Sequence, residues 1–403
     1  MRKSADITLK HRAMEMEEHK DGETSRFFSL SYLRAILPIL LTCISFLSLN
    51  FTPIVPQLQA QETIWWEQDK PNRVSKVKAK AKFGFGYDNN VSERKEDRLE
   101  SRFYQFYASS SMYMLPCERT LLSLRLQNGL KHLSSSSLSG ESVLINGLNL
   151  CLSHGLSERL TSEILTEVRG RTSIHSEGGV LPSEEAYLRG SVGAALKAVL
   201  LADVTGRAFS QYRFTNFEDF DPFDRKSPQM GLRTDVRLLP NSTISFQYSR
   251  EKTHYDKWSL ISLDEQISRA DMMDELSVFA QLYKYFLFDI TYSYQNNKSD
   301  ISGYSYRTNR FTLLMAKSLP QGLMFQLYAL IRYKKYQSEP KEDISTQVDL
   351  EDDERSVLTA KMSKEINEKC SLEAQYDWRR SSSIQESDLY TKGVFSFSMS
   401  FHF

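Results

Sequence analysis

The final nine residues of the chain, 395–403, alternate strictly between two kinds of side chain. The polar phase holds three serines and one histidine, and the apolar phase holds Phe395, Phe397, Met399, Phe401 and Phe403. Successive side chains of a β-strand point to opposite faces, so this segment predicts a strand with one apolar and one polar face. Alternation over about ten residues is typical of a strand that crosses a membrane between lipid and water.

A segment near residue 80 alternates in the same way and predicts the first strand. Its apolar phase ends on aromatic residues, and its polar phase begins with four lysines. A lysine that faces lipid at the bilayer midplane costs about 2–4 kcal/mol, so four of them in one phase must face water. The sequence therefore predicts that one phase of this strand lines an aqueous interior through Lys76, Lys78, Lys80 and Lys82.

Fourteen further segments between these two alternate similarly, which makes sixteen strands. Short turns, such as Pro240-Asn241, alternate with long polar connections, such as 338–354. This asymmetry and an even strand number are typical of bacterial outer-membrane barrels. We therefore predict an all-β chain, a transmembrane up-and-down antiparallel β-barrel of about sixteen strands. The number falls to fourteen if the boundary near Tyr285 splits one strand wrongly. The intermediate strands are expected at 102–115, 120–130, 141–151, 160–172, 184–200, 204–216, 228–239, 242–254, 272–285, 286–297, 303–318, 322–337, 355–367 and 370–382.

The N-terminal part of the chain contains one long apolar run, 35–49, which follows two arginines. Its length fits the hydrophobic region of a secretory signal peptide better than a spanning helix, which needs about twenty residues. We predict that 1–60 is a long leader with this signal peptide, that 61–73 is a periplasmic segment and that 74–403 is the barrel. An uncleaved inner-membrane anchor is the alternative. Export through a signal peptide would deliver the barrel to the bacterial outer membrane.

Motifs for catalysis or metal binding are absent from the sequence. It has no Gly-rich phosphate loop, no HExxH, no CxxC and no Gly-x-Ser-x-Gly. Three cysteines follow the leader, an odd number without metal-ligand spacing, which argues against a disulfide scaffold or a zinc site. Lys and Arg together number 51, as do Asp and Glu, so the net charge does not favour a nucleic-acid partner. We therefore expect neither an enzyme nor a cofactor.

Basic residues outnumber acidic residues in the polar phase of the predicted strands. About eighteen basic side chains accompany about seven carboxylates there, in a chain whose net charge is zero. The carboxylates are Glu163, Glu167, Asp235, Asp289, Glu365, Glu373 and Asp377. Three of the basic residues are Arg171, Lys197 and Lys361. The others, which we predict to line a pore, are Lys76, Lys78, Lys80, Lys82, Arg125, Arg169, Arg189, Arg207, Arg213, Arg233, Arg237, Arg310, Arg332, Lys334 and Arg379.

The end of the first strand carries a local resemblance to a known family. The segment Phe83-Gly84-Phe85-Gly86-Tyr87-Asp88-Asn89-Asn90-Val91 finishes on a Tyr-Asp-x-Asn-Val motif and resembles the opening of the beta-barrel porin-2 family. The resemblance implies an outer-membrane barrel, and it makes exopolysaccharide export proteins candidate partners, because members of that family often accompany such systems. Residues 88–90 are alternatively a turn that starts a loop. The terminal Phe403 resembles the signal that the outer-membrane assembly machinery recognises.

Together these features predict a porin-like channel with a basic lumen, through which small solutes diffuse passively. Anions are expected to be preferred, because rings of Lys and Arg lower the barrier to anions. One alternative is an export barrel for an acidic exopolysaccharide, which the same lining would suit. Another is a structural barrel plugged by its own loops. Conductance in planar bilayers separates the channel from the plugged barrel.

Overall fold

The computed structural model describes residues 76–91, 98–134, 142–174, 186–217, 224–255, 268–301, 303–337, 355–381 and 390–403. Nearly all of these residues lie in strands, and one helical turn among them is the 3₁₀ segment Pro320–Gly322. The strands are β1 (Lys76–Asp88), β2 (Ser101–Cys117), β3 (Thr120–Ser134), β4 (Ser142–Ser157), β5 (Leu160–Ile174), β6 (Tyr187–Leu201), β7 (Val204–Phe217), β8 (Arg225–Leu239), β9 (Ser242–Tyr255), β10 (Arg269–Tyr283), β11 (Leu287–Ser299), β12 (Tyr306–Leu319), β13 (Leu323–Tyr336), β14 (Arg355–Asn367), β15 (Cys370–Ser381) and β16 (Thr391–His402).

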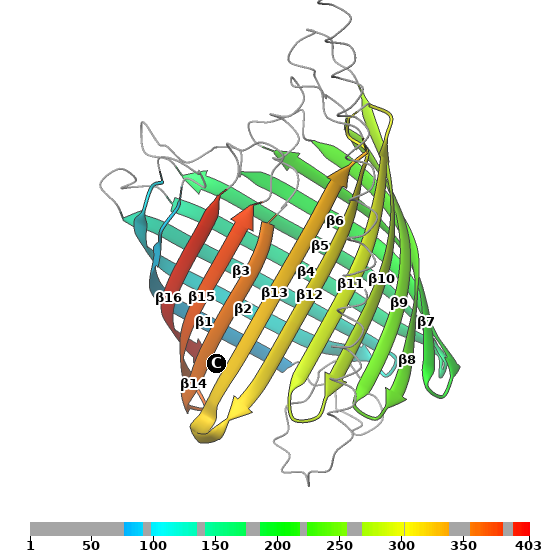
Figure 1. The fold of residues 1–403 in the computed structure, drawn as a ribbon. Helices are drawn as coiled ribbons and strands as arrows, with labels where there is room; N and C mark the ends of the chain where they lie inside the picture. The colour runs from blue at the N-terminus through cyan, green and yellow to red at the C-terminus, as the bar shows by residue number, and fades with distance from the viewer. Residues whose placement is uncertain are drawn as a thin grey trace, which may run out of the picture. The chain divides into compact units, whose positions relative to one another are not determined.

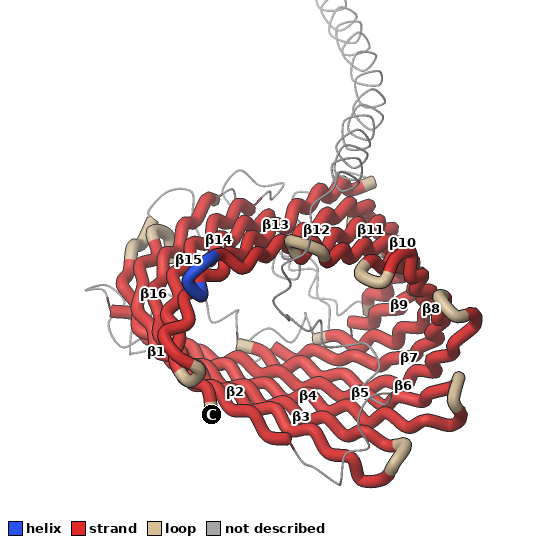
Figure 2. The backbone as a smooth tube through the Cα atoms, turned by 90° about the horizontal axis from the view of Figure 1, so that it is seen from below, coloured by secondary structure: helices blue, strands red, loops and turns tan. Residues whose placement is uncertain are grey.

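The strands form one closed antiparallel barrel. Each strand pairs with its neighbours in chain order, and β1 also pairs with β16. In Figure 2 the strand labels follow one another around the ring, with β1 between β2 and β16. The seam between β1 and β16 runs from the pair Lys80 and His402 to the pair Asp88 and Val394. Closure leaves no strand edge without a partner, which a spanning sheet requires because lipid offers no hydrogen bonds.

The connections differ between the two ends of the barrel. At one end, which we call the turn end, seven connections span two or three residues each, as at Pro240 and Asn241. Figure 1 shows the C-terminus at this end, together with the β12–β13 hairpin. At the other end, the loop end, the connections span six to eighteen residues. The asymmetry that the sequence predicts is therefore confirmed.

The strand register separates the side chains into an inner and an outer face. Directly paired residues of an antiparallel sheet share a face, and one phase can be followed around all sixteen strands without a break. The outer face carries exposed apolar side chains, such as Phe83, Met230 and Leu232, while Ser398 and Ser400 of the inner face are buried. Apolar residues therefore face the membrane side, as the alternation predicts.

The predicted strand number is confirmed, and so is the boundary near Tyr285, because 284–286 form the turn between β10 and β11. Several strands continue further towards the loop end than predicted. For example, β3 continues to Ser134 and β8 already begins at Arg225. The expected start of β8 at residue 228 falls on a proline, which has no backbone N–H to donate to a neighbouring strand. In the structure β8 stays paired with β7 at Pro228, and only its pairing with β9 is interrupted there.

The described strands belong to one compact unit, Pro71–Phe403. The predicted leader 1–60 with its apolar run 35–49, and the predicted periplasmic segment 61–73, lie outside the described residues, so they stay predictions. Within the part of the chain that the structure describes, no helix is long and apolar enough to cross a membrane.

Candidate functional site

The candidate site is the inner face of the barrel, where the register places all fifteen basic residues of the predicted pore lining. Lys82 pairs with Tyr107 on one side and with Ser400 on the other, so these three residues share a face. The same face can be followed from each strand to the next until it includes all fifteen residues. The residues are Lys76, Lys78, Lys80 and Lys82 on β1, Arg125 on β3, Arg169 on β5, Arg189 on β6, Arg207 and Arg213 on β7, Arg233 and Arg237 on β8, Arg310 on β12, Arg332 and Lys334 on β13, and Arg379 on β15.

The inner face also carries charged residues that the sequence prediction does not include. Most of them lie beyond the predicted strand ends, whereas two carboxylates, Glu251 and Glu275, already lie in the polar phase of predicted strands and could have been found there. Among the strand residues whose side chains the structure describes, the inner face holds twenty-two basic and eleven acidic residues, so the excess of positive charge is eleven. The additional residues are Lys131, Arg225, Arg269, Lys392, Asp88, Glu251, Asp271 and Glu275.

Many of the inner-face carboxylates bind a basic residue two strands away. Arg213 of β7 reaches over β8 to Glu251 of β9, with 2.6 Å between the guanidinium Nη2 and the carboxylate Oε2. Other ion pairs on the inner face also join residues that are two strands apart. Residues two strands apart converge on the concave side of a barrel and diverge on its convex side, so these pairs are possible because both residues face inward. In the described part of the chain, four further pairs of this kind are Lys82–Glu373, Lys131–Asp88 at 3.4 Å, Arg207–Glu163 at 2.8 Å and Arg310–Glu275 at 3.1 Å.

The Tyr-Asp-x-Asn-Val segment closes the barrel seam at the loop end. The backbone N–H of Asn89 donates to the carbonyl of Gly393 (3.1 Å), whose own N–H donates to the Asn89 side chain (2.7 Å). The Asn90 amide donates to the carbonyl of Thr391. Asp88 is fully buried, and its Oδ2 lies 3.2 Å from the Lys392 ammonium. These residues are therefore more than a turn, because they join the first strand to the last.

Gly86, in the same segment, allows a close approach across the seam. A Cβ atom at this position would lie 2.3 Å from the carbonyl oxygen of Phe395 and 2.4 Å from the ring of Phe103. Phe103 is buried and packs with Val91, Leu133 and Val394 in a small apolar cluster. The aromatic ring takes the space that a side chain at Gly86 would need, which explains the glycine.

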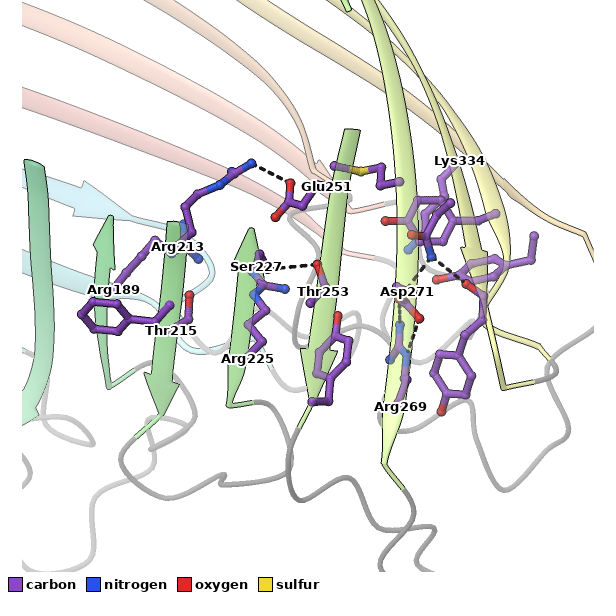
Figure 3. Close-up of a pocket in the computed structure, with 17 residues that line it drawn as sticks. Arg189, Arg213, Thr215, Arg225, Ser227, Glu251, Thr253, Arg269, Asp271 and Lys334 are labelled. Atoms are coloured by element: carbon purple, nitrogen blue, oxygen red, sulfur yellow. Dashed lines mark hydrogen bonds and ion pairs between the residues drawn. The ribbon is translucent and has the colours of Figure 1, made fainter. Parts of the chain in front are cut away.

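A cavity of about 200 Å³ opens on the inner face at the loop end, along β6 to β13. Figure 3 shows the labelled side chains on neighbouring strands along one stretch of wall. The lining combines charges with tyrosines. Its charged residues are Arg189, Arg213, Arg225, Arg269, Lys334, Glu251 and Asp271, and its tyrosines are Tyr255, Tyr304, Tyr306 and Tyr336.

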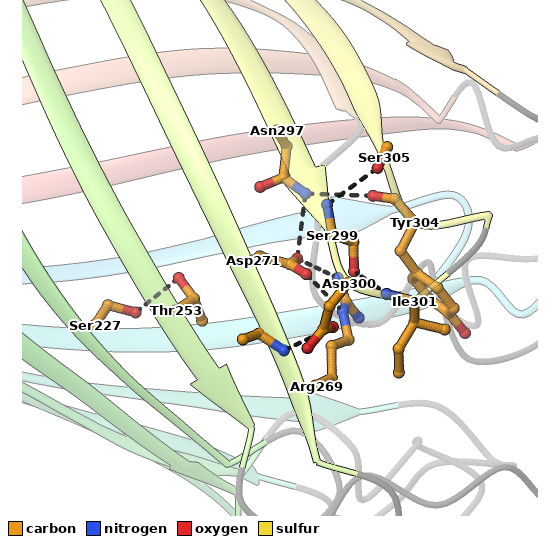
Figure 4. Close-up of polar contacts among 11 residues, drawn as sticks. Ser227, Thr253, Arg269, Asp271, Asn297, Ser299, Asp300, Ile301, Tyr304 and Ser305 are labelled. Atoms are coloured by element: carbon orange, nitrogen blue, oxygen red, sulfur yellow. Dashed lines mark hydrogen bonds and ion pairs between the residues drawn. The ribbon is translucent and has the colours of Figure 1, made fainter.

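One side of this cavity is held by a buried hydrogen-bond network (Figure 4). The Arg269 guanidinium donates two hydrogen bonds to Asp271, at 3.0 and 2.5 Å, and Asn297 donates to both Asp271 and the carbonyl of Tyr304. Arg269 also lies over the rings of Tyr255 and Tyr304, 4.4 and 4.2 Å from their centroids. Aromatic faces and a bidentate carboxylate both favour arginine, so this side of the cavity is ordered by its own contacts.

The four lysines of β1 have a different environment. Lys82 binds Glu373, which also accepts a hydrogen bond from Lys361 at 2.6 Å. Within the described residues, Lys76 and Lys78 make no ion pair. The basic residues of β1 therefore have fewer carboxylates near them than the arginines at the loop end.

The five apolar residues of the predicted assembly signal lie on the outer face of β16 or just beyond it. The rings of Phe397 and Phe85 meet across the seam, with 5.8 Å between their centroids. Phe401 contacts Phe83 in the same way, with 6.5 Å between the centroids. Phe403 is 78% exposed, and its backbone N–H donates to the carbonyl of Ala79 at 2.9 Å. The remaining members, Phe395 and Met399, are exposed as well.

Comparisons with known proteins find likeness in solved structures alone. No family model matches the chain, so the resemblance to the beta-barrel porin-2 family stays a prediction, and no curated protein matches. Among solved structures, a bacterial polysaccharide outer membrane secretin is 8% identical, with a TM-score of 0.43 over 81% of this chain and 98% of its own. OmpT of Vibrio cholerae is 7% identical, with a TM-score of 0.46 over 82% and 99%. A FadL homologue of Pseudomonas aeruginosa is 10% identical, with a TM-score of 0.36 over 81% and 90%. Likeness at this level carries no functional argument, and the barrel fold follows from the strand pairing itself.

Proposed function

We propose that this chain is a passive, non-enzymatic channel of the bacterial outer membrane that passes small solutes and prefers anions. The excess of eleven positive charges on the inner face carries the proposal. A barrel of about sixteen strands is wide enough to leave an aqueous channel. Mobile anions are the natural counter-charge for such a lining, and charged rings of this sign lower the barrier to anion passage.

The test is the current through the purified barrel in a planar bilayer. Stepwise conductance in symmetric KCl is expected first. In a KCl gradient, the reversal potential should then have the sign of chloride preference. A reversal potential at zero or on the potassium side would contradict the anion preference. A correctly inserted barrel without conductance would contradict the channel itself and favour the plugged structural barrel.

Export of an acidic exopolysaccharide is the second candidate, and the length of the basic lining favours it. The lysines of β1 lie two residues apart, about 6–7 Å along the strand, which gives a continuous basic track for a polyanion. Under this function, polygalacturonate should block the chloride current for long intervals, whereas a neutral dextran of equal length should not. Equal effects of the two polymers would argue for simple steric exclusion and against export.

Outer-membrane assembly should depend on the exposed C-terminal residue. We propose that the assembly machinery recognises the outer face of β16 with Phe403, so Phe403→Ser should slow insertion and leave the chain open to periplasmic proteases. A pulse-chase experiment that follows heat-modifiable, folded barrel over time would measure the delay. His402→Ser is the matched control, because His402 belongs to the inner face. Equal insertion rates for both variants would remove Phe403 from the signal.

A further inference from the structure

The register places two arginines in one row of directly paired residues across the loop-end wall. Arg189 of β6 pairs with Thr215 of β7, which pairs with Arg225 of β8, which pairs with Tyr255 of β9. We call these four residues the arginine row. Neighbouring strands are about 4.8 Å apart, so the backbones of Arg189 and Arg225 are separated by roughly 10 Å with a threonine between them. A gap of this size suits a ligand group that two guanidinium groups hold from opposite sides.

A second row, one step towards the turn end, supplies further donors. It contains Arg213 and Ser227, which are direct partners in the register. The hydroxyls of Ser227 and Thr253 lie 3.0 Å apart, and this bond uses one of their two protons, so one remains to be donated. Figure 3 shows Ser227 and Arg225 side by side on β8, next to Thr215 and Arg213 on β7. The wall therefore presents both charged and neutral donors around the cavity.

The charge of the cavity lining favours an anionic occupant. Five basic side chains line it against two carboxylates. Both carboxylates already accept hydrogen bonds from arginines of the same lining, since Glu251 binds Arg213 and Asp271 binds Arg269. The lining itself therefore carries more positive than negative charge. Arginine binds carboxylates and phosphates through planar, two-pronged hydrogen bonds, which makes these groups the best-matched ligands.

We propose that this cavity is a binding site for a small solute that carries an oxyanion, a phosphate or a carboxylate. Arg189 and Arg225 hold the oxyanion, and the hydroxyls of Thr215 and Ser227 donate to it. Tyr255 closes the end of the arginine row beside the ligand. The site rests on the proposed function, because it lies on the path that a permeating anion would take, and it names the class of solute that pauses there.

Binding can be measured without any current, by isothermal titration of the detergent-solubilised full chain at low chloride. Inorganic phosphate and galacturonate are the probes, and neutral galactose is the negative control. Both anions should bind saturably. Arg189→Gln with Arg225→Gln should weaken phosphate binding at least about tenfold, since two charge-assisted hydrogen-bond donors are lost. Arg189→Lys with Arg225→Lys should lose less, because the charge stays while the two-pronged geometry is lost.

A matched control separates a site from a general positive field. Lys197→Gln with Arg237→Gln also removes two inner-face charges, but near the turn end and outside the cavity lining. It should change phosphate binding by less than about twofold, as expected for screened charges at a distance. An equal loss in the control would overturn the site, as would the absence of saturation in the unmodified chain. If the variant with Arg189→Gln and Arg225→Gln does not fold, the comparison of the double Lys variant with the same control tests the site.

The outcomes also separate this site from the channel proposal. A barrel that conducts chloride selectively but binds neither probe would retain the channel and lose the site. Saturable binding in a barrel without conductance would retain the site and lose the channel. Binding of a galacturonate trimer without any binding of phosphate would overturn the small-solute assignment in favour of a polymer.

Discussion

Two basic regions of the inner wall, the lysines of β1 and the arginine row, are organised in different directions. Lys76, Lys78, Lys80 and Lys82 follow one strand, so they lie two residues apart in the sequence. The members of the arginine row come from four different strands and meet only through the register. The first region has few carboxylates beside it, whereas the second is surrounded by ion pairs and tyrosines. The spacing of residues along one strand can be read from the sequence, whereas the alignment of residues on different strands depends on the register between them.

This difference has a consequence for how the two regions hold their charge. Lysines on one strand repel one another unless water and mobile ions screen them. Among the residues that the structure describes, just one of the four contacts a carboxylate directly, Lys82 with Glu373. At the loop end, basic residues such as Arg213 and Arg310 reach carboxylates two strands away. We therefore expect the lysines to govern the field along the lumen and the arginine row to govern contact with individual solutes.

The largest effect should follow from reversing the lysines that have no ion pair with Glu373. Changing Lys76, Lys78 and Lys80 together to Glu lowers the inner-face excess from eleven to five and leaves Lys82 with Glu373 intact. The reversal potential in a KCl gradient should move clearly towards cation preference. Changing Lys335 and Lys364 of the outer face to Glu is the control and should leave it in place. If the triple variant conducts with an unchanged reversal potential, the lysines of β1 do not line the ion path.

The next largest effect should come from removing a carboxylate that joins strands. Asp88→Asn takes the buried negative charge away from Lys131 and Lys392 at the seam. Removing one partner of a buried ion pair costs about 3–5 kcal/mol, and urea unfolding of the reconstituted barrel would measure it. Glu167→Gln, whose partner Arg169 is two residues away on the same strand and exposed, should cost less than about 1 kcal/mol. A similar loss of unfolding free energy in both variants would mean that an ion pair between strands stabilises the barrel no more than an ion pair within one strand.

A smaller effect tests the assignment of faces on which both regions depend. Leu126 and Gln127 are neighbours on β3, and the register places the first on the outer face and the second on the inner face. Leu126→Lys should destabilise the barrel by about 2–4 kcal/mol if it lies near the bilayer midplane. Gln127→Lys should assemble with little loss, because it adds a charge to a wet surface. Folding yields into lipid vesicles compare the two, and equal yields would mean that the faces are assigned wrongly.

The sequence was sufficient for features with period two. The alternation at Phe395 to Phe403 and at Lys76 to Lys82 predicts both strands and the correct faces, and the turn pattern predicts the number of strands. Strand ends at the loop side were harder, because polar residues continue beyond the last clear apolar residue. Lys131 and Arg269 were missed for this reason. The strand β8 was likewise predicted too short, because it continues past Pro228 to Arg225; a strand can keep a proline where one of its two neighbours needs no N–H from it.

The partners across strands could not be predicted, because a shift of two residues between neighbouring strands preserves the faces and changes every contact. Arg189 and Arg225 both belong to the predicted polar phase or its direct continuation. Nothing in the sequence near either residue indicates that the register places Thr215 between them. The role of Asp88 and Asn89 was equally hidden. Their motif is visible in the sequence, whereas their partners near Gly393 lie some three hundred residues away.

The five ion pairs that skip a strand also have a mechanical meaning. The hydrogen bonds of a sheet resist sliding and separation of adjacent strands, but they resist bending about the strand axes only weakly. A bond between side chains two strands apart, such as Arg207 with Glu163, spans the inside of that bend and fixes the angle between three consecutive strands. The wall should therefore resist bending where such ion pairs occur and bend more easily between them. Salt weakens these ion pairs but not the backbone hydrogen bonds of the sheet. Ionic strength should therefore change the curvature of the barrel wall without unfolding the barrel.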